Sequence, residues 1–141
     1  MSRLAARFGA QVPAIEVDAL EVRTLVEVAM DNAAEGCVRE TYGAAVAAFQ
    51  AEWAQDRAVR RAMCAIAADE AEHASLGWAI DAWARDRLGP SDRVRVDAAR
   101  DEARRGLLAR QPVSPELGGA LGLPDAAAAA HLAAELRRLW S

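Results

Sequence analysis

Apolar residues recur along most of this chain at the three- and four-residue intervals of α-helices that pack in a bundle. The first such segment follows a capping box formed by Thr24 and Glu27, and it predicts a helix over residues 25–54. The second follows Asp56, a favourable N-cap residue, and predicts a helix over residues 57–87. Two rods of about 30 residues each, joined by a short turn, predict an antiparallel helical hairpin.

The pattern divides the chain into three parts, which are an irregular N-terminal segment at residues 1–23, the hairpin at 24–90, and two shorter C-terminal helices within 91–141. We expect Gly89 to close the hairpin as the residue after the helix, with Pro90 as a stop. Ser91 then caps a helix over 92–109. A link rich in Gly and Pro precedes the last predicted helix, over 125–140.

The second rod carries one continuous seam with the spacing of a bundle interface. Its members alternate in steps of four and three residues and are Val59, Met63, Ile66, Glu70, His73, Gly77, Ile80 and Ala84. All of them are apolar or glycine except Glu70 and His73, which are adjacent members near the middle of the seam. A carboxylate and an imidazole therefore interrupt an otherwise apolar face.

The first rod shows the same kind of interruption at Glu35. The stripe that contains it consists of Leu25, Val28, Asn32, Glu35, Val38, Tyr42, Val46, Phe49 and Trp53. Because the predicted turn lies near residue 55, folding the hairpin brings Glu35 within about one helical turn of the level of Glu70 and His73. We therefore expect these three side chains to converge inside the core.

A buried, ionised carboxylate costs several kcal/mol unless it gains a proton, a cation or a metal ion. A Glu and a His three residues apart on one helix face can hold a single first-row metal ion. Glu35, Glu70 and His73 are therefore candidate metal ligands. A hydrogen-bonded Glu–His pair without a metal ion is the alternative interpretation of the same residues.

The residues around these candidates resemble the ferritin-like superfamily, the di-iron carboxylate four-helix bundles. The similar segments are Asp31-Asn-Ala-Ala-Glu35-Gly-Cys-Val-Arg-Glu-Thr-Tyr42 and Ile66-Ala-Ala-Asp-Glu70-Ala-Glu-His73-Ala, within a stretch of roughly residues 22–88. The amino-acid sequence of the first segment is similar to that of bacterial ferritin-like domain proteins. This resemblance implies an all-α, ferritin-like helical bundle.

The resemblance also implies roles for individual residues. Glu35 would be a metal ligand from the first helix, Glu70 a bridging carboxylate and His73 a terminal imidazole ligand. Asp69 would hydrogen-bond a ligand histidine. Tyr42 lies about two turns from Glu35 on the same stripe, and a position in the core is its simpler interpretation.

A complete site of this family takes two Glu residues and two Glu-x-x-His motifs from four helices, whereas this chain supplies one of each. His131 precedes Glu135 by four residues, which is the wrong order and spacing for a second motif. We therefore expect a homodimer, or another partner chain, to supply the second half. The resemblance then implies iron, or manganese, in a two-metal centre that oxidises Fe(II) or reacts with oxygen or peroxide, with no catalytic residue beyond the ligands.

Composition limits the other classes of function. The formal charge is −4, so a nucleic acid is a poor default partner. No stretch approaches the ~20 apolar residues of a membrane span. Without a signal peptide, and with Cys37 and Cys64 as free thiols, the chain is expected to be cytoplasmic.

Two other functions remain open from the sequence. The hairpin fits a non-enzymatic helical oligomerisation module with a vestigial site. An iron-storage shell is a weaker hypothesis, because the two C-terminal helices carry no sign of cage assembly.

Overall fold

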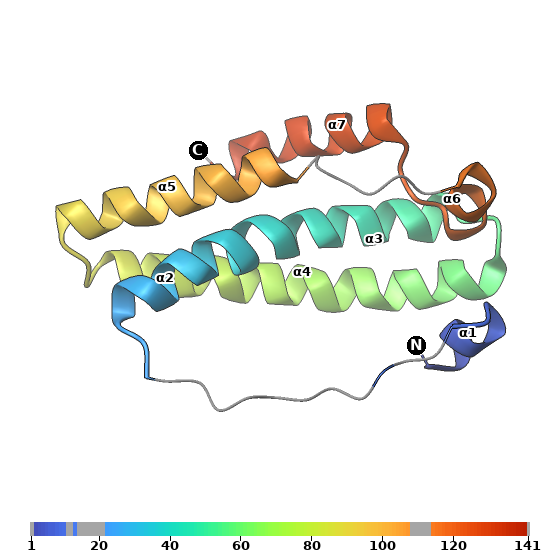
Figure 1. Ribbon diagram of the computed structural model, residues 1–141, viewed down its shortest axis with the longest axis horizontal. Coiled ribbons are helices and arrows are strands. Elements are labelled where there is room, and N and C mark those ends of the chain that lie inside the picture. The colour runs from blue at the N-terminus through green and yellow to red at the C-terminus, as the bar shows by residue number, and fades with distance from the viewer. Residues whose placement is uncertain (1, 11–12, 14–21, 108–113, 141) are drawn as a thin grey trace.

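The computed structural model describes residues 2–10, 13, 22–107 and 114–140, and every regular element in these ranges is helical. The predicted all-α class is confirmed. Figure 1 shows two long antiparallel rods, with two further helices along one side of the pair. The elements in chain order are α1 (Ser2–Arg7), α2 (Leu25–Ala34), the π-helical turn η1 (Glu35–Glu40), α3 (Thr41–Trp53), α4 (Arg57–Arg85), α5 (Pro90–Gly106), α6 (Pro115–Leu121), α7 (Ala126–Glu135) and the 3₁₀ turn η2 (Leu136–Arg138).

The first rod consists of α2, η1 and α3 and is one continuous helical run. The capping box is confirmed, because the Glu27 N–H donates to the Thr24 hydroxyl and the Glu27 carboxylate accepts from the Thr24 N–H. The regular α-helix predicted over 25–54 is wrong in the middle, where residues 35–40 form a π-helical turn. Such a wide turn shifts every later side chain around the helix axis relative to an α-helical projection.

The second rod is the helix α4. The prediction for Asp56 is confirmed, since its carboxylate accepts from the N–H groups of Ala58 and Val59. The helix ends at Arg85, and Gly89 serves as the N-cap of α5 rather than as a left-handed residue after α4. Pro90 opens α5, the helix position that suits its fixed φ and missing N–H, so the predicted cap at Ser91 is wrong.

The two rods cross most closely at Gly36 and Gly77. A Cβ atom built on Gly77 would lie 2.6 Å from the Gly36 carbonyl carbon, and one built on Gly36 would lie 3.1 Å from the Gly77 Cα. Two helix backbones can approach each other this closely only where neither residue has a side chain. Gly43, in contrast, has nothing within 4 Å of its added Cβ.

The core lies between the first rod and the C-terminal helices, because α5 packs on α2 and α7 packs on α3 (Figure 1). One buried cluster joins Ala29 and Ala33 of α2 to Val96 of α5. A second cluster consists of Val38, Tyr42, Val46, Ala103 and Trp140. These helices therefore bury one side of the hairpin.

Two short helices were not expected from the sequence. Ser2–Arg7 forms α1 within the segment predicted to be irregular, whose residues 11–12 and 14–21 lie outside the described residues. Pro115–Leu121 forms α6 within the predicted link, capped by the Ser114 hydroxyl and ended by Gly122 at φ 65°. Residues 108–113 also lie outside the described residues, and they include the predicted end of the helix at 109.

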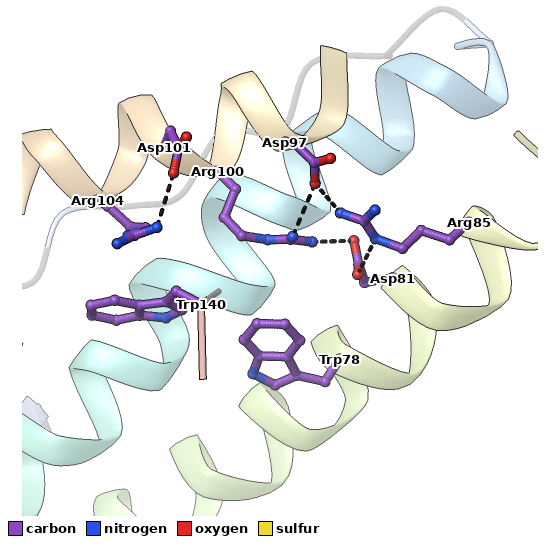
Figure 2. Close-up of a pocket in the computed structure, with 8 residues that line it drawn as sticks. All are labelled: Trp78, Asp81, Arg85, Asp97, Arg100, Asp101, Arg104 and Trp140. Carbon is purple, nitrogen blue, oxygen red and sulfur yellow. Dashed lines mark hydrogen bonds and ion pairs between the residues drawn. The ribbon is translucent and has the colours of Figure 1, made fainter. Parts of the chain in front are cut away.

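An ion-pair network joins α4 to α5 (Figure 2). Arg100 donates to Asp81 at 2.6 Å and to Asp97 at 3.3 Å, while Arg85 pairs with the same two carboxylates. The Arg100 and Asp81 side chains are each only 8% exposed. A partner from another helix therefore compensates the burial of the Arg100 charge.

Within the described part of the chain, no helix combines the length and the apolar character needed to cross a bilayer. Both cysteines are free, as expected, but only Cys37 is buried and Cys64 is exposed.

The close crossing predicts that Gly77→Ala destabilises the protein. The added methyl overlaps the Gly36 backbone, and overpacking of this kind costs about 1–3 kcal/mol. Gly43→Ala is the matched control, because open space and a better helix propensity should raise stability by up to about 1 kcal/mol. Urea unfolding of the two variants measures both changes, and equal stabilities would contradict the crossing.

Candidate metal centre

Three side chains that can ligate a metal ion come together from the two rods. They are Glu40, at the end of the π-helical turn, and Glu70 and His73, both on α4. One ligand atom of each lies within 4.8 Å of the others. His73 Nδ1 is 3.6 Å from a Glu70 carboxylate oxygen and 4.0 Å from one of Glu40. Within the described ranges, no second cluster of three such side chains occurs.

Local structure explains how each of these three side chains reaches this point. Glu70 and His73 are three residues apart on one helix, so their side chains project from the same face. Glu40 is the last residue of the π-helical turn, on the antiparallel neighbour. The predicted pairing of a Glu-x-x-His motif with a glutamate of the other rod is present, but the glutamate is not the one expected.

Glu35 does not join the cluster. Its carboxylate accepts from the Arg39 guanidinium, one turn later on the same rod, and its side chain is 59% exposed. The expected stripe assumed a regular α-helix, whereas the structure buries Ala29 and Ala33, each one position after the predicted Val28 and Asn32. The π-helical turn then adds a further shift, which brings Glu40 rather than Glu35 towards Glu70 and His73.

The two remaining sequence candidates lie outside the cluster. Asp69 is exposed on α4, next to Glu70, and it is not among the three clustered side chains. Tyr42 is 4% exposed and packs with Val38, Val46 and Trp140 in the core. A core position for Tyr42, the simpler interpretation from the sequence, is therefore what the structure shows.

The cluster lies at the surface of the chain, not in its interior. The side chains of His73, Glu40 and Glu70 are 63%, 38% and 30% exposed. The expected convergence inside an apolar core is thus wrong for the single chain, because α5 and α7 cover the opposite set of residues, which includes Val38 and Tyr42. Water can screen these carboxylates, so the repulsion between them is weaker than it would be in a buried site.

The electrostatics of the cluster are those of two crowded carboxyl groups. A hydrogen bond from protonated Glu40 to Glu70, with partial burial and the Glu70 charge, raises the pKa of Glu40 above its ordinary value, while His73 opposes the shift. Two carboxylates at this separation favour a shared proton or a bound cation.

The π-helical turn is held firmly against α4 behind this cluster. The Asn32 amide donates to the Gly77 carbonyl oxygen at 2.9 Å, and the Cys37 thiol donates to the same oxygen at 3.5 Å. Burial raises the pKa of Cys37 to about 11, so the thiol keeps the proton that it donates. Trp78 adds a hydrogen bond from its indole N–H to the Thr41 hydroxyl at 3.2 Å.

A second polar site on the chain is a pocket of about 520 Å³ beside the ion-pair network (Figure 2). Its lining residues are Trp78, Asp81, Arg85, Asp97, Arg100, Asp101, Arg104 and Trp140. Each of its three aspartates accepts from an arginine of the same pocket. These carboxylates are therefore already compensated, and the cluster on the hairpin is the better candidate for a cation.

Sequence reasoning missed Glu40, although a signal for it was present. The midpoint between Glu40 and the motif at residues 70–73 falls at about residue 56, inside the observed turn at 54–56, whereas the midpoint from Glu35 falls at about residue 53. Residues level with each other across an antiparallel hairpin must be equally far from its turn. The α-helical stripe points to Glu35 instead, because it takes residues 35–40 as regular α-helix, whereas they form a π-helical turn.

No protein-family model matches this chain, and the searches of curated proteins and of solved structures gave no match either.

The crowded carboxylates predict that Glu40→Gln stabilises the metal-free protein at neutral pH. A carboxyl whose pKa is raised by folding stabilises the fold fully below its unfolded pKa, and that contribution is lost as the pH rises through the folded pKa. The neutral amide keeps hydrogen-bonding capacity without the charge, so its advantage should disappear in acid. Thermal melts of chelator-treated protein at pH 4 and pH 7 measure this effect, with the exposed Glu52→Gln as control. A Glu40→Gln variant less stable than wild type at pH 7 would argue against crowding.

Proposed function

We propose that this chain is a ferritin-like metal-binding protein whose Glu40, Glu70 and His73 form one half of a two-metal carboxylate centre. Iron is the expected metal, with manganese as the alternative. The observation that carries the proposal is the meeting of two carboxylates and an imidazole from the two rods within 4.8 Å. Oxygen and nitrogen donors of these kinds suit divalent first-row ions.

The state of the cluster favours a cation. The Glu40 and Glu70 carboxyl groups are close enough that a hydrogen bond between them raises the pKa of Glu40 above its ordinary value. A divalent ion bound between the two ionised carboxylates would offset their mutual repulsion. When bound, iron would supply redox chemistry with oxygen or peroxide; the chain's own residues bind and orient the ion.

Three protein ligands on an open surface make an incomplete site. First-row ions take roughly four to six donors, and His73 is 63% exposed, so one side of the cluster faces solvent. A second copy of this chain, placed face to face across a twofold axis, would add the same three groups and give a centre with four carboxylates and two imidazoles. Large apolar residues on the two rods are available for such a contact, with Trp53 61% exposed and Leu76 59% exposed.

A non-enzymatic helical module is the second candidate function. The exposed Trp53, Leu76 and Trp83 favour it, because each is a large apolar side chain that is open to a partner whether or not a metal is bound. The two functions differ in whether association depends on the metal. If the chain is a metal-binding protein, a chelator should lower both the mass of the protein in solution and its melting temperature. If it is a helical module, the chelator should change neither.

Metal titration of two matched variants tests the proposed function. Anaerobic Fe²⁺, or Mn²⁺, is titrated into metal-free wild type, Glu40→Ala and Glu35→Ala, and the bound ion is measured by calorimetry and elemental analysis. Wild type and Glu35→Ala should each bind about one ion per chain, whereas Glu40→Ala should lose at least tenfold in affinity because a direct ligand is removed. Both glutamates lie on the same helical turn, so the comparison controls for charge and helix stability.

Equal binding by Glu40→Ala and wild type would refute the assignment of Glu40. Loss of the ion in Glu35→Ala alone would instead restore the ligand set expected from the sequence. A wild type that binds no ion but stays dimeric in chelator would favour the helical module.

A further inference from the structure

The last residue that the structure describes, Trp140, reaches the back of the turn that carries Glu40. Its side chain is 4% exposed, whereas its neighbour Leu139 is 54% exposed. The indole N–H donates to the Cys37 carbonyl oxygen at 3.0 Å, in a buried hydrogen bond. Figure 2 shows the Trp140 ring beside Arg104 of α5, whose guanidinium lies 5.9 Å from the ring. The C-terminal segment is thus anchored on the π-helical turn.

The accepting carbonyl has a special place in this turn. In a regular α-helix, the Cys37 carbonyl would accept from the Thr41 N–H, four residues later. Here the Thr41 N–H donates to the Val38 carbonyl, and the Cys37 carbonyl accepts from the indole. The hydrogen bond from Trp140 therefore satisfies a carbonyl that lacks its α-helical partner, Thr41, in this turn.

A return to α-helical geometry would move Glu40. One residue of an α-helix corresponds to about 100° around the axis, so removing the extra residue of the wide turn rotates Glu40 relative to α2 by roughly that angle. The glutamate would then leave Glu70 and His73. A π-helical turn is less favourable than an α-helical one in isolation, so contacts from outside the helix must hold it.

Two contacts clamp the turn from opposite sides at Cys37. Its thiol donates to the Gly77 carbonyl of α4, and its own carbonyl accepts from Trp140. We propose that Trp140 is a positioning residue of the metal centre, which keeps Glu40 in place by stabilising the π-helical turn through the Cys37 carbonyl. This inference rests on the proposed function, because it assigns a role towards the ion that Glu40 would hold.

The test compares Trp140→Phe with wild type, using Co²⁺ as the metal probe. Phenylalanine keeps an aromatic ring in the pocket but has no N–H. The dissociation constant for Co²⁺ should rise about fivefold, as expected for the loss of one hydrogen bond of ordinary net strength. The visible absorption spectrum of the Co²⁺-saturated protein should also differ from that of wild type, because the Glu40 carboxylate would bind the ion in a different geometry. Leu139→Ala, at the exposed neighbouring position, should leave both unchanged.

Circular dichroism and melting temperature show whether each variant is folded, and Trp140→Leu provides a second variant without the N–H. Unchanged affinity and an unchanged Co²⁺ spectrum in a folded variant would overturn the positioning role while leaving the proposed function intact. A wild type that binds no Co²⁺, Fe²⁺ or Mn²⁺ would overturn both. A lower melting temperature with the wild-type spectrum and affinity would mean that Trp140 only supports packing, which also overturns the inference.

Discussion

The backbone crossing of Gly36 and Gly77 is the constraint on which the rest of the structure depends. It brings the two rods together at the π-helical turn, and the Gly77 carbonyl accepts from both Asn32 and Cys37 of the opposite rod. The π-helical turn then determines which glutamate lies beside the Glu-x-x-His motif. Packing, helix register and ligand geometry are therefore fixed at one place, about midway along the hairpin.

Most of the hairpin could be predicted from the sequence because its signals are local. The capping box at Thr24 and the Asp56 cap involve residues three apart or fewer, and the apolar periodicity of α4 needs no tertiary knowledge. The site could be predicted only in part, since Glu70 and His73 share a helix face but Glu40 depends on the π-helical turn. Gly77 and Trp140, which are distant in sequence, hydrogen-bond to that turn, so the local stripe through Glu35 could not predict it. The burial of Arg100 is equally non-local, because Asp81 compensates its charge from another helix.

The position of the cluster links the fold to its proposed chemistry. The C-terminal helices cover Val38, Tyr42 and the adjacent core, and leave Glu40, Glu70 and His73 accessible. Two carboxylates held close together without a metal ion lower the free energy of unfolding. A cluster of like charges that destabilises the fold is more typical of a functional site than of a packing contact. The open side of the cluster and the exposed apolar residues on the same rods are consistent with a second chain that completes the site.

The most direct measurement is a diffraction experiment on crystals loaded with Mn²⁺, in which the anomalous signal locates the ion. The account predicts an ion bonded to Glu40, Glu70 and His73, with Glu35 still paired to Arg39 and residues 35–40 still in a π-helical turn. An ion bonded to Glu35, or saturating Mn²⁺ with no ion near His73, would contradict it.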